Sequence, residues 1–231
     1  MRRTRFKKWG AAALMAIALG AGLAVQKTIA QSRSAQQQVV IIADLHEANP
    51  VRNNEQYRRR ITARLKQVVS GLGLDYMDQL ILRTAGDASP ARHVDPLWNQ
   101  DIEFQYRRRE PADVPGLIDA LMQRLPQLKA HQHSRLAWAV ERLQGTIDCG
   151  RAKVTLIVLS NGLEAGMVEG GAFRMRTFDG QPFQGCSSAR VLFLGFGASV
   201  PQNDPNIVEA ARRLFRRVFQ HAGFGTVEFD N

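Results

Sequence analysis

Apolar residues in this chain gather in short continuous runs that alternate with segments of helical spacing. Two of the runs, residues 39–43 and 154–159, are almost entirely apolar, and most of their side chains branch at Cβ. Such a run is typical of a strand with both faces covered, as in a parallel sheet packed between helices. We expect further strands at 79–84, 191–196 and 226–229, and a half-exposed edge strand at 101–106, where polar and apolar residues alternate.

Between these runs, apolar residues recur every three or four positions, which predicts amphipathic helices. The helices are expected at 55–71, from about Asp113, from about Ser134 as far as Ile147, and near the C-terminus. The last helix is the best delimited, because Pro205 suits a first helical position and Gly223 a stop. Strands that alternate with helices predict the α/β class: a doubly wound, mostly parallel sheet with helices on both faces and one antiparallel edge strand.

The first 30 residues differ in composition from the rest of the chain. They hold six cations and no acid, and an apolar run at 10–25 is followed by Thr-Ile-Ala at 28–30, where small residues suit a signal peptidase. The run is shorter than the roughly 20 residues that span a bilayer, but the cleavage site is mediocre. A signal peptide at 1–30 and an uncleaved membrane anchor therefore both stay open. The polar residues 31–38 are interpreted as a spacer before one domain at 39–231.

The chain of 231 residues has a formal net charge of +10, which raises the question of nucleic acid or anionic membrane as a partner. Six cations belong to the N-terminal segment, so the other 25 face all 21 acids and leave a net charge of only +4. The arginines at 58–60, 107–109 and 212–217 suit the outer faces of helices and the guard of a sheet edge. We therefore expect no nucleic-acid partner, although one basic face suits anionic lipid or an acidic partner.

Two cysteines, Cys149 and Cys186, each stand just before one of the predicted inner strands. If these strands are parallel neighbours, both cysteines lie at the same end of the sheet. Disulfides are common in exported proteins, and closing a loop of this length stabilises a fold by roughly 4 kcal/mol on the chain-entropy model. The sequence favours a Cys149–Cys186 disulfide over two unrelated buried thiols. It has no Cys-x-x-Cys spacing for a redox or zinc-ribbon role.

Candidate chemistry is expected where strands end, because ligands of open α/β sheets bind beyond the carboxyl ends of the strands. The first strand ends in Asp44, followed by His46 and Glu47, and the strand at 154–159 leads into Ser-Asn-Gly. The sequence has no Gly-x-Ser-x-Gly elbow, no dinucleotide-binding motif and no phosphate-binding loop. Enzymatic activity is therefore uncertain, and a non-enzymatic role is favoured.

Four features stand in a familiar order: an apolar first strand that ends in Asp44, a helix that opens at Ser134, Leu-Ile-Val-Leu-Ser-Asn-Gly at 156–162 and the apolar strand at 191–197. This order resembles a von Willebrand factor type A (vWA) domain over about residues 38–231. In that family a divalent cation, usually Mg²⁺, is held at the metal-ion-dependent adhesion site (MIDAS). Its ligands come from an Asp-x-Ser-x-Ser turn, a threonine at a later helix start and the aspartate of a Thr-Asp-Gly turn.

The resemblance implies a degenerate MIDAS in this chain. It places Asp44 on the first aspartate, His46 and Ala48 on the serines, Ser134 on the threonine and Asn161 on the second aspartate. Hard cations prefer carboxylate, hydroxyl and water oxygens, and the exchanges remove one carboxylate and two hydroxyls. We therefore expect Asp44 and Ser134 to bind Mg²⁺ weakly or not at all, with no cofactor required.

A zinc-like site is an alternative, because imidazole suits a softer metal. Asp44 and His46 would form it with one of two later histidines, His131 or His133. Solvated histidines at a helix cap are the other explanation for that pair.

These features favour an exported or membrane-tethered, non-enzymatic vWA-like module that binds a protein of the bacterial cell envelope. We expect it in the periplasm, or anchored in the inner membrane through residues 10–25 and facing the periplasm. Two alternatives stay open: a metal-dependent hydrolase that uses Asp44 and nearby histidines, and a domain with only a scaffolding role. The binding crevice is expected to be framed by Asp44, His46, Ala48, Ser134 and Asn161, and extended by the glycine-rich segment 162–186.

Overall fold

The computed structural model describes residues 36–76, 78–85, 100–103, 113–130, 136–162, 166–167, 173–174, 177–198 and 205–230. The predicted signal or anchor, most of the spacer and the arginine run at 107–109 lie outside the described residues, as do Ser134, His131 and His133. Among the described residues, no helix combines the length and the apolar character that a membrane crossing requires.

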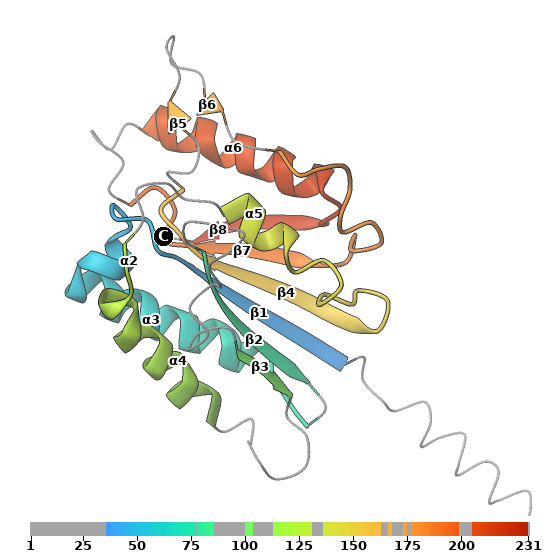
Figure 1. The fold of residues 1–231 in the computed structure, drawn as a ribbon, viewed down its shortest axis with the longest axis horizontal. Coiled ribbons are helices and arrows are strands. Elements are labelled where there is room, and N and C mark those ends of the chain that lie inside the picture. Colours follow the sequence, from blue (N-terminus) through green and yellow to red (C-terminus); the bar gives the residue numbers. More distant parts are fainter. Residues whose placement is uncertain are drawn as a thin grey trace, which may run out of the picture. The chain divides into compact units, whose positions relative to one another are not determined.

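A mostly parallel sheet forms the centre of the fold. Its strands are β1 (Gln36–Asp44), β2 (Gln79–Ala85), β3 (Gln100–Glu103), β4 (Ala152–Leu159), β7 (Arg190–Leu194) and β8 (Thr226–Asp230). They lie in the order β3-β2-β1-β4-β7-β8 (Figure 1). Every neighbouring pair is parallel except β2 and β3, which pair antiparallel. A separate hairpin joins β5 (Gly166–Met167) to β6 (Phe173–Arg174).

Helices pack against this sheet. They are α2 (Pro50–Asn53), α3 (Glu55–Gly71), α4 (Val114–Arg124), α5 (Leu136–Glu141) and α6 (Pro205–His221), with a 3-10 turn at Leu125–Gln127. Successive side chains of a strand point to opposite faces, so the strands contribute to two hydrophobic clusters. Ile41 and Ile157 pack with residues of α3 and α4, whereas Val40 and Leu156 pack with residues of α5 and α6. The α/β class predicted from the sequence is confirmed.

One predicted helix is wrong in its length. The apolar spacing predicts a helix as far as Ile147, whereas α5 ends at Glu141. Turns follow, with Gly145 at a φ of +85° that ordinary side chains rarely adopt. Leu143 is nonetheless buried, and Ile147 packs on the same cluster as α5. The spacing therefore reflects burial, which an irregular segment can also supply.

Other differences are smaller. The strand expected at 191–196 ends at Leu194, because Gly195 turns the chain with a φ of +86°. The edge strand expected at 101–106 is described only as β3, and the rest of that range lies outside the described residues. The short helix α2 and the β5–β6 hairpin are not predicted by the sequence pattern, because two to four residues are too few to show a period.

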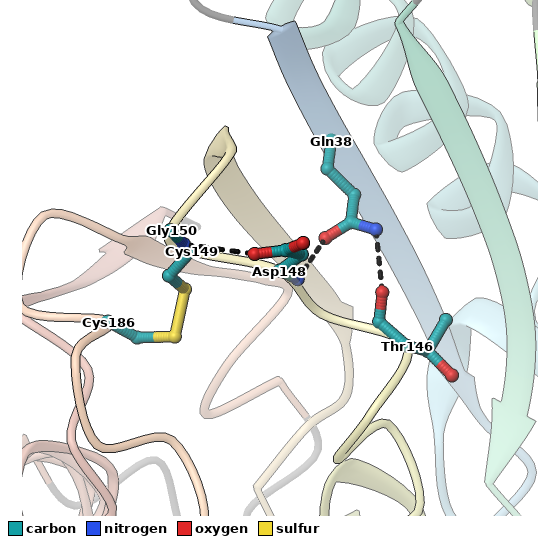
Figure 2. The surroundings of a disulfide bond; sticks show 6 residues. All are labelled: Gln38, Thr146, Asp148, Cys149, Gly150 and Cys186. Atoms are coloured by element: carbon teal, nitrogen blue, oxygen red, sulfur yellow. Dashed lines mark hydrogen bonds between the residues drawn. A yellow bond between two sulfur atoms is a disulfide. The ribbon is translucent and has the colours of Figure 1, made fainter.

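A disulfide links the segments before β4 and β7 at the amino-terminal end of the sheet. Cys149 precedes β4 and Cys186 precedes the neighbouring strand β7, and their Cα atoms lie 5.1 Å apart. The predicted pairing is confirmed. Gln38 ties the same segment to β1: its Nε2 donates to the Thr146 carbonyl at 2.8 Å, and its Oε1 accepts from the Asp148 N–H at 3.1 Å (Figure 2). The segment before β4 is thus held from both sides.

Candidate functional site

The direction in which successive strands are added to the sheet reverses between β1 and β4. From this pair, β2 and β3 lie to one side and β7 and β8 to the other. In open α/β sheets the carboxyl ends at such a switch point are where ligands bind. Asp44 ends β1, and Ser160 and Asn161 follow β4 directly, so the candidate residues lie at this edge.

Asp44 and Ser160 form the centre of a buried polar network. The Ser160 hydroxyl donates to Oδ2 of Asp44 at 2.7 Å, and the His46 N–H donates to Oδ1 at 3.0 Å. Ser160 Oγ also accepts from the Gly162 N–H at 3.1 Å. Asp44 is 1% exposed and Ser160 0%. Both carboxylate oxygens are therefore engaged inside the protein.

Two asparagines fasten the loop after β1 to the end of β4. Asn161 Nδ2 donates to the Ala48 carbonyl at 2.9 Å. Asn49 Nδ2 donates to the carbonyls of Asp44 at 2.8 Å and Leu159 at 3.1 Å, while its Oδ1 caps α2 by accepting from the Val51 N–H. Side-chain amides that bond to backbone groups in this way fix loop geometry.

The predicted binding crevice leaves out two residues of this site, Asn49 and Ser160. Asn49 precedes Pro50, and an asparagine before a proline is a helix-start pattern that signals its capping role. Its two carbonyl partners belong to different strands, and no local pattern reveals them. Ser160 is adjacent to the predicted Asn161, but its partner Asp44 is 116 residues away.

His46 and Glu47 form the solvent-facing rim of this edge. Glu47 is exposed and His46 half-buried. The His46 ring accepts from the Ala48 N–H through Nδ1 at 3.1 Å, which fixes the orientation of the ring. The Glu47 carbonyl accepts from Asn53 Nδ2 at 2.7 Å, so the rim is also tied to α2.

The structure brings Asp44, His46, Ala48 and Asn161 together, and Ser134 lies outside the described residues. Their donor set does not fit the MIDAS pattern. Each oxygen of the Asp44 carboxylate already accepts a hydrogen bond, Ala48 has no side-chain oxygen and His46 offers nitrogen, whereas Mg²⁺ prefers oxygen ligands. No group of three or more His, Cys, Asp or Glu side chains suited to a metal ion occurs among the described residues.

Glycines allow the turns after β4 and β7 to meet. Gly162 has a φ of +78° and lies so close to the Phe196 ring that a Cβ atom would overlap it. Gly197, with a φ of +82°, donates its N–H to the Asn161 carbonyl at 3.0 Å. The buried Phe196 ring therefore packs directly against the turn after β4, and its position depends on the absence of a side chain at Gly162.

Tyr57 of α3 covers the carboxyl end of β7. A Cβ atom on Gly195 would lie 2.9 Å from the Tyr57 hydroxyl oxygen, so the ring packs directly on the turn. Burial raises the pKa of Tyr57, while a hydrogen bond from Arg60 and its positive charge act in the opposite direction. Arg64 lies one helical turn after Arg60 on α3. Its guanidinium group forms an ion pair with Asp230, the last residue of β8, at a distance of 2.6 Å.

Two hollows in the described part of the chain lie away from the switch point. One, of about 550 Å³, lies between α3 and α4 and is lined by basic residues of α3. Two of its three basic side chains form ion pairs, because Lys66 lies 2.6 Å from Asp119 and Arg59 pairs with Glu55. The other, of about 290 Å³, adjoins the disulfide. Neither hollow is lined by the residues of the polar network.

No protein-family model matches this chain, and none of the curated proteins is significantly similar to it.

Proposed function

We propose that this chain is an exported or membrane-tethered vWA-like interaction module of the bacterial cell envelope, which binds a protein partner and catalyses no reaction. In this proposal the fold is the doubly wound vWA arrangement, with helices on both faces and an antiparallel edge strand. One observation supports the proposal: the polar side chains at the ends of β1 and β4 form hydrogen bonds with each other and with the backbone of the adjoining loop.

This network supports binding better than catalysis. A general base must accept a proton from a substrate, yet both oxygens of the buried Asp44 already accept hydrogen bonds from the protein. The network instead holds the loop at 45–49 in one geometry. Rigid loops bind with a smaller loss of conformational entropy, so they favour recognition of a partner. The rim residues His46 and Glu47 are the groups that such a partner would contact.

The disulfide supports an extracytoplasmic location. Disulfides persist in oxidising compartments and are rare in the cytosol, and the Cys149–Cys186 bond joins the segments that precede the neighbouring strands β4 and β7. Together with the basic and apolar pattern of residues 1–30, it favours the periplasm, either as a free domain or tethered to the inner membrane through residues 10–25.

A cross-linking experiment in the cell envelope tests the proposal. The full chain is compared with a rim variant, His46→Ala with Glu47→Ala, and with a control variant, Arg151→Ala with Lys153→Ala. The control positions are exposed at the amino-terminal end of β4. We expect one envelope protein to cross-link to the wild type and the control, and its affinity for the purified rim variant to fall at least about tenfold.

Equal capture by the rim variant would contradict the binding site proposed. Metal analysis of protein purified without chelator separates the alternative function. Stoichiometric zinc or manganese that disappears in Asp44→Ala would favour the metal-dependent hydrolase over the interaction module.

A further inference from the structure

The β8 strand ends the sheet. It pairs with β7 along one edge and, within the described residues, with no strand along the other. A strand edge of this kind presents backbone N–H and C=O groups to which an extended peptide can add. Phe229 belongs to the hydrophobic cluster of α6, whereas Glu228 and Asp230 pair with Arg190 and Arg64. Acidic groups on this strand are thus already neutralised.

The helix beside this edge is strongly basic. α6 carries four arginines, at 212, 213, 216 and 217, and one acid, Glu209. The Glu209 carboxylate lies 3.8 Å from Arg212 and 3.9 Å from Arg213, at the limit of an ion pair. Among the described residues, Arg216 and Arg217 form no ion pair. Most of the positive charge of α6 is therefore not compensated by ion pairs within the described residues.

Two of the four arginines lie over β8. The guanidinium carbons of Arg212 and Arg216 are 5.9 Å and 5.6 Å from the centre of the Phe229 ring. The Phe229 ring is stacked on the Phe193 ring, with 5.1 Å between the ring centroids. Both guanidinium groups therefore pack on a ring that is itself held in place. The side chain of Arg212 is 25% exposed, against 60% for Arg213, which places Arg213 further from the strand. Nε of Arg212 is buried without a hydrogen-bond partner among the described residues.

The spacing of Arg212 and Arg216 along α6 matches the spacing of alternate residues in an extended peptide. Arg212 and Arg216 are one helical turn apart, a rise of about 6 Å. Alternate residues of a strand, which share one face, are about 6.7 Å apart. Because α6 connects the parallel strands β7 and β8, it runs back along them. Two carboxylates at alternate positions of an added strand would therefore meet the two guanidinium groups.

We propose that the free edge of β8, with Arg212 and Arg216, is a docking site for an extended acidic segment of a partner protein. The segment pairs with the β8 backbone and places carboxylates at every second residue against the guanidinium groups, where charge-assisted hydrogen bonds form. This site is separate from the rim at His46 and Glu47, and it does not depend on the function proposed for that rim.

Peptide binding to the full chain tests the proposal. The probe is a labelled octapeptide of alternating Glu and Val, compared with the Lys–Val peptide and with an acidic peptide that has a central proline. We expect the Glu–Val peptide alone to bind and to slow amide exchange in Thr226–Asp230. Arg212→Gln with Arg216→Gln should weaken binding at least about tenfold. Arg213→Gln with Arg217→Gln, which removes the same charge from the same helix, should weaken it less than about threefold.

Several outcomes would overturn the proposal. An equal loss in the two double variants would indicate a diffuse field of charge, and equal binding of the proline peptide would exclude strand addition. If the Glu–Val peptide fails to bind, the arginines only guard the edge against aggregation. If phosphatidylglycerol vesicles bind through Arg212 and Arg216 while the peptide does not, the face is a lipid surface.

Two further variants keep the test interpretable. Should Arg212→Gln with Arg216→Gln unfold, Arg212→Lys with Arg216→Lys keeps the charge and loses the planar guanidinium fork. It should bind the peptide with intermediate affinity, and undiminished affinity would contradict the guanidinium contacts. The rim variant at His46 and Glu47 should bind the peptide like the wild type, which separates a failure here from a failure of the proposed function.

Discussion

The Ser160 hydroxyl donates to Oδ2 of Asp44 at 2.7 Å, and both side chains are shielded from solvent. The bond joins the carboxyl ends of two neighbouring parallel strands, β1 and β4. Because Ser160 also accepts from the Gly162 N–H at 3.1 Å, one hydroxyl positions a carboxylate and a turn together. The geometry of the switch point therefore rests on this pair.

Ser160→Ala should lower the free energy of unfolding by about 1–3 kcal/mol, because it removes the two buried hydrogen bonds that the hydroxyl forms with Asp44 and Gly162. Urea denaturation measures the loss. Ser188→Ala, at an exposed position, is the matched control and should change stability by less than about 0.5 kcal/mol. Equal stability of the two variants would show that the hydrogen bond contributes nothing.

Gly162→Ala should destabilise the protein more than Gly180→Ala. Both glycines have a positive φ, +78° and +71°, so alanine costs each about 1–2 kcal/mol of backbone strain. A Cβ atom at 180 meets no atom within 4 Å, whereas one at 162 overlaps the Phe196 ring and adds about 1–3 kcal/mol of overpacking. Urea denaturation of the two single variants gives the difference.

A double-variant cycle isolates the contact with the ring. In a Phe196→Ala background, the cost of Gly162→Ala should fall to that of Gly180→Ala, because the obstructing ring is gone. An unchanged cost would place the strain somewhere other than Phe196.

The sequence predicts the strands and the disulfide for a common reason. Aliphatic runs such as 39–43 show burial on both faces directly, and Cys149 and Cys186 stand in the same place relative to two such runs. The contacts of Asn49 with Leu159 and of Ser160 with Asp44 could not be predicted, because they depend on the register between β1 and β4, whose partners lie more than a hundred residues apart. The overlong helix to Ile147 has another cause: apolar spacing reports burial, and a turn can bury Leu143 as well as a helix can.

Reduction of the disulfide should lower stability by about 4 kcal/mol on the chain-entropy model. The Cys149–Cys186 bond spans a sequence separation of 37 residues, and its loss frees the segment before β7 from the segment before β4. Urea denaturation with and without a thiol reductant measures the effect. The variant Cys149→Ser with Cys186→Ser should be insensitive to the reductant, and a wild type equally insensitive would argue against the bond.

Alkaline pH should destabilise the protein through Tyr57. Burial raises the pKa of Tyr57 above its ordinary value of about 10, so the folded state holds the phenolic proton more tightly than the unfolded state does. The unfolded state then binds fewer protons above pH 10, and stability falls as the pH rises. The stabilisation is complete below about pH 10 and is lost as the pH passes through the raised value.

Tyrosinate absorbance locates this titration. Tyr76 is 51% exposed and serves as the control. Tyr57→Phe should remove a component that titrates above pH 10, whereas Tyr76→Phe should leave that component in place. The variant Tyr57→Phe should also lose less stability than the wild type between pH 9 and pH 12, because a phenyl ring at 57 has no proton to release. If Tyr57 instead titrates at or below its ordinary value of about 10, the Arg60 guanidinium outweighs burial, and the ring is less protected by the turn at Gly195 than the geometry implies.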